Sequence, residues 1–369
     1  MRVKLKDITK FSKGTQINGK NLIDDGAYLY LNGGINPSGK WNEFNVAENT
    51  VTISEGGNSS GYVNYMSKAF WCGAHCYYLY DGPKNSKYLY YALKSQQERL
   101  FRIRSGACMP NIKKSDLGNF IIEYEEDETR QEEVVKVLEK CELLIEDYNK
   151  KLALLDEAVR ARFVEMFGDP VTNDILWNTD VLKDICTKIG SGSTPRGGKE
   201  SYIDEGISLI RSMNVHNAYF EYKDLAHITL DQAEKLNNVV VEHDDLLFNI
   251  TGASVARCCV VPSDVLPARV NQHVCILRCR EKINPIFLQG LLVNENYQGK
   301  LLQIAKSGAT REAINKQQLE SLEIMIPTLE LQNQFASFVE EIDKSRSRIQ
   351  KSLEASQELF DSLMQEYFG

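Results

Sequence analysis

Two segments of this 369-residue chain carry apolar residues at alternating steps of three and four, residues 125–168 and residues 328–369. This is the heptad spacing that keeps one stripe of a helix against a neighbouring helix. Each pattern therefore predicts a long helix. The first helix should end at Gly168, because a glycine followed closely by Pro170 is a typical stop signal.

The two segments also repeat each other at a constant offset of 201 residues. Identical residues at this offset are Gln131/Gln332, Glu139/Glu340, Lys150/Lys351, Leu152/Leu353, Glu157/Glu358, Glu165/Glu366, Phe167/Phe368 and Gly168/Gly369. The chain thus alternates a globular unit and a long helix, twice. We expect an α+β protein in which the helices form an antiparallel coiled coil and separate two mixed α/β domains in a pseudo-two-fold arrangement.

The expected organisation is a first domain at 1–124, a central helix at 125–168, a second domain at 169–327 and a C-terminal helix at 328–369. Runs of β-branched and aromatic residues between turn signals predict strands, and amphipathic runs predict helices. In the first domain these are strands at 27–31, 50–54, 75–80 and 120–122 and a helix at 86–103. In the second domain they are strands at 207–210, 246–252 and 271–277 and a helix at 285–305.

The repeat weakens in the loops, although one loop recurs. Ser-Gly-Ala begins at Ser105 and again at Ser307, and each copy is followed by an isoleucine, Ile112 and Ile314. Two copies of one scaffold therefore diverge where a ligand would be read. Because duplex DNA has two-fold local symmetry, such a frame predicts two unlike half-sites around an unread spacer, with the helices as the ruler.

Charge is unevenly distributed over the chain, whose net charge is −8. Residues 1–124 hold 16 Lys and Arg against 10 Asp and Glu, whereas residues 169–327 hold 16 against 20. The remaining excess of acid lies on the two helices, where solvated faces normally carry it. Any DNA contact in the second domain must therefore come from locally clustered cations.

The nine cysteines are scattered and odd in number, which suits reduced thiols in a cytoplasmic protein, and no apolar run is long enough for a membrane span. Cys72, His75 and Cys76 lie close together, but Cys275 and Cys279 alternate with Leu277 as on a buried strand face. Zinc sites need four ligands in reach. We therefore expect no metal site.

Three motifs, together with the twice-repeated order of domain and long helix, carry a resemblance to a known family. They are the Ser-Gly-Ala-x-x-x-x-Ile element, Ser-Gly-Ser-Thr-Pro at 191–195, and Ile-Pro-Thr-Leu-Glu-Leu-Gln at 326–332. The whole chain resembles the specificity (S) subunits of type I restriction–modification systems. The first domain departs from the family pattern because Glu-Tyr-Glu-Glu-Asp at 123–127 replaces its proline-containing lead-in.

The resemblance implies a cytoplasmic subunit that reads double-stranded DNA and itself catalyses nothing, without a cofactor. Two N6-adenine methyltransferase (M) subunits would dock on the helices, and translocating restriction (R) subunits would join them. Enzymatic signatures such as a P-loop or a Gly-x-Gly cofactor turn are missing from the sequence, which agrees with a binding role. The alternative from a different class is a non-catalytic coiled-coil adaptor whose two domains bind protein partners.

Candidate DNA contacts are loop residues with cationic, amide or hydroxyl side chains, which bind phosphates and base edges. In the first domain they are Lys13, Thr15, Gln16, Lys20, Asn32, Asn36, Lys40, Asn58, Arg102, Arg104, Asn111 and Lys113. In the second domain they are Ser193, Thr194, Arg196, Lys199, Arg211, Asn214, His216, Arg257, Gln272, Arg311 and Lys316. The alternative is that they are solvated turn residues. The glycines near Gly56 and Gly192 indicate either close approach to phosphate or plain turns.

Apolar helix residues outside the heptad stripe are candidates for docking a partner subunit, because exposed apolar patches often mark such sites. They are Val135, Leu143, Leu154, Phe167, Phe338 and Phe368. Additional packing within the chain is the rival explanation.

Overall fold

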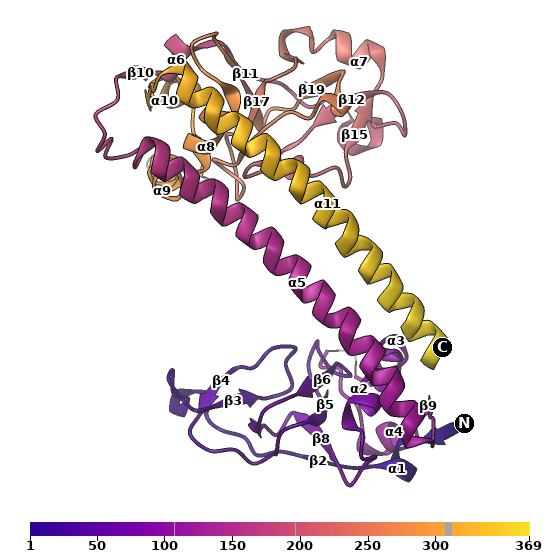
Figure 1. Ribbon diagram of the computed structural model, residues 1–369. Helices are drawn as coiled ribbons and strands as arrows, with labels where there is room; N and C mark the ends of the chain where they lie inside the picture. Colours follow the sequence, from indigo (N-terminus) through magenta and orange to yellow (C-terminus); the bar gives the residue numbers. More distant parts are fainter. Residues whose placement is uncertain (107, 196, 307–311) are drawn as a thin grey trace. The chain divides into compact units, whose positions relative to one another are not determined.

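The computed structural model describes residues 1–106, 108–195, 197–306 and 312–369. The chain divides into two compact units: unit 1 is Met1–Lys150 with Gln350–Gly369, and unit 2 is Lys151–Ile349. Two 40-residue helices, α5 (Glu128–Phe167) and α11 (Leu329–Phe368), each contribute residues to both units (Figure 1).

Unit 1 is built from short strands and helices before the start of α5. They are β1 (Arg2–Lys4), α1 (Leu5–Ile8), β2 (Lys10–Lys13), β3 (Tyr28–Leu31), β4 (Gly39–Trp41), β5 (Thr50–Ser54), β6 (Val63–Met66), β7 (Phe70–Cys72), β8 (Cys76–Tyr80), α2 (Ser86–Lys94), α3 (Gln97–Arg102), α4 (Lys114–Gly118) and β9 (Ile121–Glu123).

Unit 2 follows the same order with extra elements in the middle. They are β10 (Thr179–Val181), α6 (Leu182–Ile185), β11 (Cys186–Ser191), β12 (Ile207–Ile210), β13 (Val215–His216), β14 (Tyr219–Phe220), β15 (Ala226–Ile228), α7 (Leu230–Glu234), β16 (Val240–Val241), β17 (Leu246–Asn249), β18 (Cys258–Val260), β19 (Ala268–Val270), β20 (Val274–Cys279), α8 (Pro285–Val293), α9 (Glu295–Lys306), α10 (Lys316–Glu320) and β21 (Glu323–Met325).

The sheets of the two units share one plan. The strand order β2-β8-β5-β6 in unit 1 corresponds to β11-β20-β17-β18 in unit 2, antiparallel throughout. A second sheet in each unit contains one parallel pair, β3 with β7 and β12 with β19. The α+β class and the doubled domain plan expected from the sequence are therefore confirmed.

The long helices run antiparallel within each unit. In the core of unit 1, Val134 and Leu138 near the start of α5 join Met364 and Phe368 at the end of α11. Apolar side chains at these positions stabilise the unit by about 1.5–3 kcal/mol each when fully buried. Both stretches of unit 1 are therefore needed for its core.

In unit 2 the pairing is reversed. Phe163 and Phe167 at the end of α5 meet Phe335 near the start of α11, with the ring centroids of Phe163 and Phe335 5.5 Å apart at 80°. Such edge-to-face pairs are favourable beyond their buried area. α5 ends directly after Phe167, where Gly168 adopts φ +74°.

Each of the two expected amphipathic helices is in fact a pair of helices. The run 86–103 breaks at Ser95 and Gln96, and the run 285–305 breaks at Asn294. At Asn294 the backbone leaves the helical conformation, with ψ 138°, and the side-chain Oδ1 accepts the N–H of Asn296 at 3.0 Å, which begins α9. Gln96 donates through Nε2 to the carbonyl oxygen of Phe368 at 2.9 Å.

Candidate nucleic-acid interface

The loop after the central strand of the main sheet is anchored identically in both units. Gly57 after β5 and Gly252 after β17 both adopt φ +78°. The Gly57 N–H donates to Pro110 O at 2.9 Å, and the Gly252 N–H donates to Glu312 O at 2.9 Å. Each glycine loop is therefore fixed to the segment that precedes the last short helix, and its polar side chains stand on a supported backbone.

A second pair of glycines explains part of the sequence repeat. A Cβ on Gly14 would lie 1.9 Å from the carbonyl oxygen of Cys72, and one on Gly192 would lie 1.8 Å from that of Val270. No side chain fits at such distances. Close approach of two protein backbones therefore requires glycine at both positions.

At the start of the glycine loop of unit 1, the side chain of Glu55 lies between those of Lys13 and His75. The Glu55 carboxylate is 2.7 Å from Lys13 Nζ and 3.5 Å from His75 Nδ1. The Glu55 side chain is mostly buried, whereas that of Lys13 is exposed. The ion pair holds the Lys13 ammonium group at the loop, where the sequence predicted a cation.

Three predicted contacts of unit 1 gather on the same loop. Arg104 donates to Phe101 O at 2.7 Å and to Asn58 O at 3.3 Å, and Asn111 Oδ1 accepts from Ser105 Oγ at 3.0 Å. Asn58 and Asn111 are exposed and Arg104 is half-buried, so the cluster presents two amides and part of a guanidinium to solvent.

In unit 2, the corresponding loop carries a chain of hydrogen bonds. Thr251 Oγ1 lies 2.6 Å from His273 Nδ1, and His273 Nε2 lies 3.2 Å from Gln272 Nε2. Gln272 also accepts a hydrogen bond from Thr194 Oγ1. The two predicted contacts Thr194 and Gln272 are thus brought together across the sheet edge.

Beside this chain lies a cavity of about 530 Å³. It is lined by Ser212, Met213, His216, Thr251, Gly252, Ala253, Ser254, Arg257 and His273. On its wall, Arg257 Nη1 is 3.3 Å from His216 Nδ1, and the His216 ring stacks on Tyr219 with centroids 4.6 Å apart. Sequence reasoning missed Tyr219 and the β13–β14 hairpin that carries it, because two-residue strands leave no periodic signal.

The other predicted contacts are distributed over the surfaces of the two units. Exposed residues are Lys13, Thr15, Gln16, Lys20, Asn36, Lys40, Asn58, Arg102, Asn111, Lys113, Ser193, Gln272 and Lys316. Half-buried residues are Asn32, Arg104, Thr194, Arg211, His216 and Arg257. Arg196, Arg311 and the side chain of Lys199 lie outside the described part of the chain.

One predicted DNA contact is wrong. Asn214 is fully buried, and its Oδ1 accepts the Arg211 N–H at 3.1 Å while its Nδ2 donates to Glu221 O at 2.9 Å. These bonds close the turn that leads into β13. Asn214 therefore supports the hairpin and cannot reach a ligand.

For three of the predicted docking residues, the expectation that they are exposed is also wrong. Val135 and Phe368 are buried in the core of unit 1, and Phe167 is buried in that of unit 2. At the helix ends the sheets and short helices cover more than one stripe of each long helix, so residues outside the heptad seam are packed as well. Phe338 is half-buried, with the Arg162 guanidinium 5.9 Å from its ring centroid. Leu143 and Leu154 are 63% and 61% exposed.

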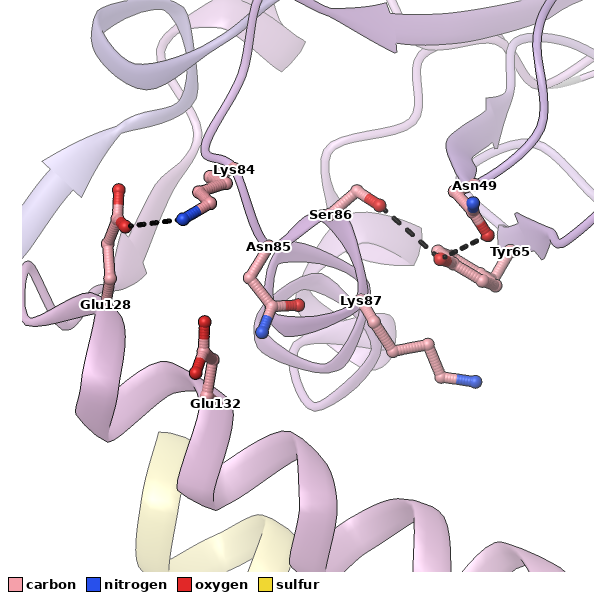
Figure 2. A pocket seen from close by; sticks show the side chains of 8 residues that line it. All are labelled: Asn49, Tyr65, Lys84, Asn85, Ser86, Lys87, Glu128 and Glu132. Atoms are coloured by element: carbon pink, nitrogen blue, oxygen red, sulfur yellow. Dashed lines mark hydrogen bonds and ion pairs between the residues drawn. The ribbon is translucent and has the colours of Figure 1, made fainter.

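A further pocket, of about 320 Å³, lies in unit 1 between the starts of α2 and α5 (Figure 2). Figure 2 shows Glu128 and Glu132 on one side, with Lys84 reaching Glu128 at 3.5 Å. Two carboxylates repel a phosphate backbone, and none of the predicted DNA contacts lines this pocket. We therefore place the candidate interface at the glycine loops.

The cysteines pack as small apolar residues. Cys72 and Cys76 are buried, and a hydrogen bond between them, together with burial, raises the pKa of the Cys72 thiol. Burial raises the pKa of Cys275 to about 12. The described residues contain no group of three or more His, Cys, Asp or Glu placed to hold a metal ion. Among the described helices, none combines the length and apolar character needed for a membrane span.

Comparison with known proteins agrees with this architecture. A putative type I specificity subunit of Mycoplasma pneumoniae is 37% identical over 210 residues, which is 54% of this chain and 55% of that protein. One of Mycoplasma genitalium is 35% identical over 163 residues, 40% of this chain and 42% of that protein. The matched regions thus span about half of these curated relatives.

The crystal structure of the type I restriction–modification S subunit from M. genitalium matches with a TM-score of 0.70 at 20% identity, over 100% of this chain and 96% of that one. This likeness shows the fold. The type I restriction modification DNA specificity domain matches residues 1–156 and again residues 175–357. The chain therefore belongs to the type I restriction–modification specificity subunit family, as its sequence motifs indicated.

Proposed function

We propose that this chain is the DNA-reading subunit of a type I restriction–modification complex, and that each unit reads one half of a bipartite target. The observation that carries the proposal is that the two units share one framework but have different side chains in their glycine loops. Gly57 and Gly252 occupy equivalent loops with the same φ, yet the residue after the glycine is Asn58 in one loop and Ala253 in the other. Equal scaffolds with different side chains suit two different half-sites.

The distribution of cations supports DNA as the ligand in spite of the net negative charge. Lys13 and Arg104 stand at the loop of unit 1, and Arg257 stands at that of unit 2. Arg and Lys side chains near backbone amides are the usual partners of phosphates and guanine edges.

The long helices are proposed to set the spacer and to dock the M subunits, which in turn would supply adenine methylation, with R subunits added for cleavage. Leu143 and Leu154 support this role, because each is an exposed leucine on a helix face away from its unit's core. Exposed apolar side chains of this kind are typical of partner contacts. The chain itself is proposed to bind and not to catalyse, and to act in the cytoplasm.

The decisive experiment maps methylated adenines by single-molecule sequencing in cells with and without this chain. We expect a bipartite motif that disappears on deletion, and replacement of residues 1–124 by the matching segment of another S subunit should change only one half. Deleting whole turns from both helices should shorten the spacer. A motif that survives deletion, or an unchanged spacer, would contradict the proposal.

The salt dependence of DNA binding distinguishes the proposed DNA-reading function from that of a protein-binding adaptor. The chain purified with its M partner should bind duplex DNA with an affinity that falls steeply as salt rises, because phosphate contacts release counterions. Absence of salt-sensitive duplex binding would favour the adaptor. A Leu154→Glu variant should lose M-subunit binding in pull-down assays while its unfolding midpoint stays that of the wild type.

A further inference from the structure

Unit 2 contains an element that unit 1 lacks. Residues 211–225, which include the β13–β14 hairpin, connect β12 to β15, whereas residues 32–38 alone connect the corresponding strands β3 and β4. The hairpin reverses the chain in two residues, Asn217 and Ala218, with Ala218 at φ +63°. An insertion confined to one of two equivalent domains is a natural place for a half-specific reading element.

The hairpin is rigidly attached to the main sheet of unit 2. Ala218 N–H donates to Cys258 O at 2.9 Å, and buried Asn249 donates through Nδ2 to Ser212 O at 2.9 Å. Val215 and Phe220, which pair with each other across the hairpin, are both buried. Its position relative to the glycine loop is therefore set by the backbone and the core.

The side chains of the other hairpin pair, His216 and Tyr219, face the cavity and solvent. Tyr219 is 52% exposed, and its ring lies nearly parallel to that of His216, at 14°. His216 Nδ1 faces Arg257 Nη1 at 3.3 Å. Because a guanidinium can only donate, Nδ1 must accept, and the neutral imidazole then carries its proton on Nε2.

The paired side chains of His216 and Arg257 present donors only. Nε2 of His216 donates, and among the described residues the Arg257 guanidinium has His216 as its only side-chain partner, so its remaining N–H groups can donate as well. In the major groove, guanine shows two adjacent acceptors, N7 and O6, whereas adenine pairs one acceptor with a donor. A two-stranded ribbon fits that groove.

We propose that the β13–β14 hairpin enters the major groove of the half-site read by unit 2, and that Arg257, oriented by His216, reads a guanine there. Arg257 is the specificity-determining residue, and the stacked rings of His216 and Tyr219 are its positioning support. The hydrogen bond from Asn249 N–H to Arg257 O in unit 2 corresponds to that from Ser54 N–H to Tyr62 O in unit 1, so unit 1 has a tyrosine at the equivalent position. The two half-sites should accordingly differ in this base.

This inference rests on the proposed function, and one selection experiment tests the two separately. The complex of full-length chain and M subunits is incubated with a randomised duplex library at fixed salt, and the bound DNA is sequenced. A wild-type complex that selects no motif contradicts both proposals. A wild-type bipartite motif keeps the proposed function and makes the variants informative.

In the Arg257→Ala variant, preference for one guanine in one half should fall by about 10- to 100-fold, since a bidentate arginine–guanine contact is worth about 1–3 kcal/mol. Arg257→Lys should lose part of the same preference, because an ammonium still donates to guanine but lacks the planar fork. His216→Ala and Tyr219→Ala should weaken preference at that position and at no other. The other half should be unchanged in all four.

The matched control is Arg280→Ala, which removes an exposed arginine of unit 2 that does not line the cavity. It should leave every base preference as in the wild type. An Arg257→Ala variant that keeps the guanine preference, or one that weakens both halves equally, overturns the inference. Thermal unfolding of each variant verifies that the fold is retained, and Arg257→Met, which keeps a long side chain without donors, provides the test if the alanine variant is unstable.

Discussion

Arg278 binds Asp245 at two points, with Nε 2.8 Å from Oδ1 and Nη2 2.8 Å from Oδ2. Asp245 is fully buried, and the hydrogen bond that Arg278 donates to Asp245 raises the pKa of Arg278 although burial opposes it. Arg278 also donates to Val240 O at 3.1 Å, so the pair joins β20, β16 and the turn before β17. It is a structural centre of unit 2.

Replacing Arg278 by Leu should therefore destabilise the protein by about 3–5 kcal/mol, because a buried carboxylate loses its partner. The surface pair of Lys316 and Glu320 is the control, and Lys316→Ala should change the free energy of unfolding by less than about 1 kcal/mol. Urea titrations followed by circular dichroism measure both. Equal losses in the free energy of unfolding would show that the buried pair contributes no more to stability than the surface pair.

Alanine at Gly192 should be strongly destabilising, since its Cβ would meet Val270 O at 1.8 Å. Gly299→Ala in α9 provides the opposite case, because a Cβ there meets nothing within 4 Å. That change should stabilise the protein by about 0.5–1 kcal/mol, the usual gain when a glycine inside a helix becomes alanine. Thermal unfolding should shift in opposite directions for the two variants.

Gln131 and Gln332 occupy equivalent positions in the helical repeat, and each donates through Nε2 to a carbonyl oxygen before its helix, that of Glu125 at 2.6 Å for Gln131. Their Oε1 atoms differ. Gln332 Oε1 accepts the Asn284 N–H at 2.8 Å and its Nε2 donates to Pro327 O at 2.9 Å, whereas Gln131 Oε1 is buried without a partner among the described residues. Gln332→Leu should thus cost about 1–3 kcal/mol more than Gln131→Leu. Denaturant unfolding of both variants checks the difference, and equal losses would contradict the assignment.

The thiols should react in two classes. Cys108 is exposed, whereas burial raises the pKa of Cys259 and of Cys275 to about 12 and leaves almost no thiolate at pH 8. A thiol reagent added to the native protein should label Cys108 first, and Cys108→Ser should remove the fast phase. Fast labelling of Cys259 or Cys275 in the folded protein would contradict this packing.

The long helices were predictable because heptad patterns of about 40 residues leave few alternatives, as were the strands rich in tyrosine and valine. The break at Asn294 was not, because a side-chain hydrogen bond begins the next helix there and periodicity does not reveal that bond. The break at Ser95 and Gln96 was not predictable either, and among the described residues no side chain caps α3 there. One repeat signal was available and went unused. Leu-Lys-Asp-Ile occurs at Leu5–Ile8 and again at Leu182–Ile185, and both copies form the short helix after the first strand.

For the candidate site, residue type alone identified cations and amides but not their neighbours. Arg257 was selected as a polar loop residue, and its pairing with His216 depends on a hairpin that sequence reasoning did not find. Asn214 was selected by the same criterion, yet its amide is used up by backbone groups in the turn. Which polar side chains stay available depends on turn geometry, which composition does not encode.

The discontinuous make-up of unit 1 has a consequence for synthesis. Unit 2 is one uninterrupted stretch, 151–349, whereas the core of unit 1 needs Met364 and Phe368. On the ribosome, domains usually fold in the order in which they emerge. Here the earlier-translated unit must keep an open apolar face until the end of α11 has emerged, so a chain released from the ribosome after residue 349 should hold a finished unit 2 and an unfinished unit 1.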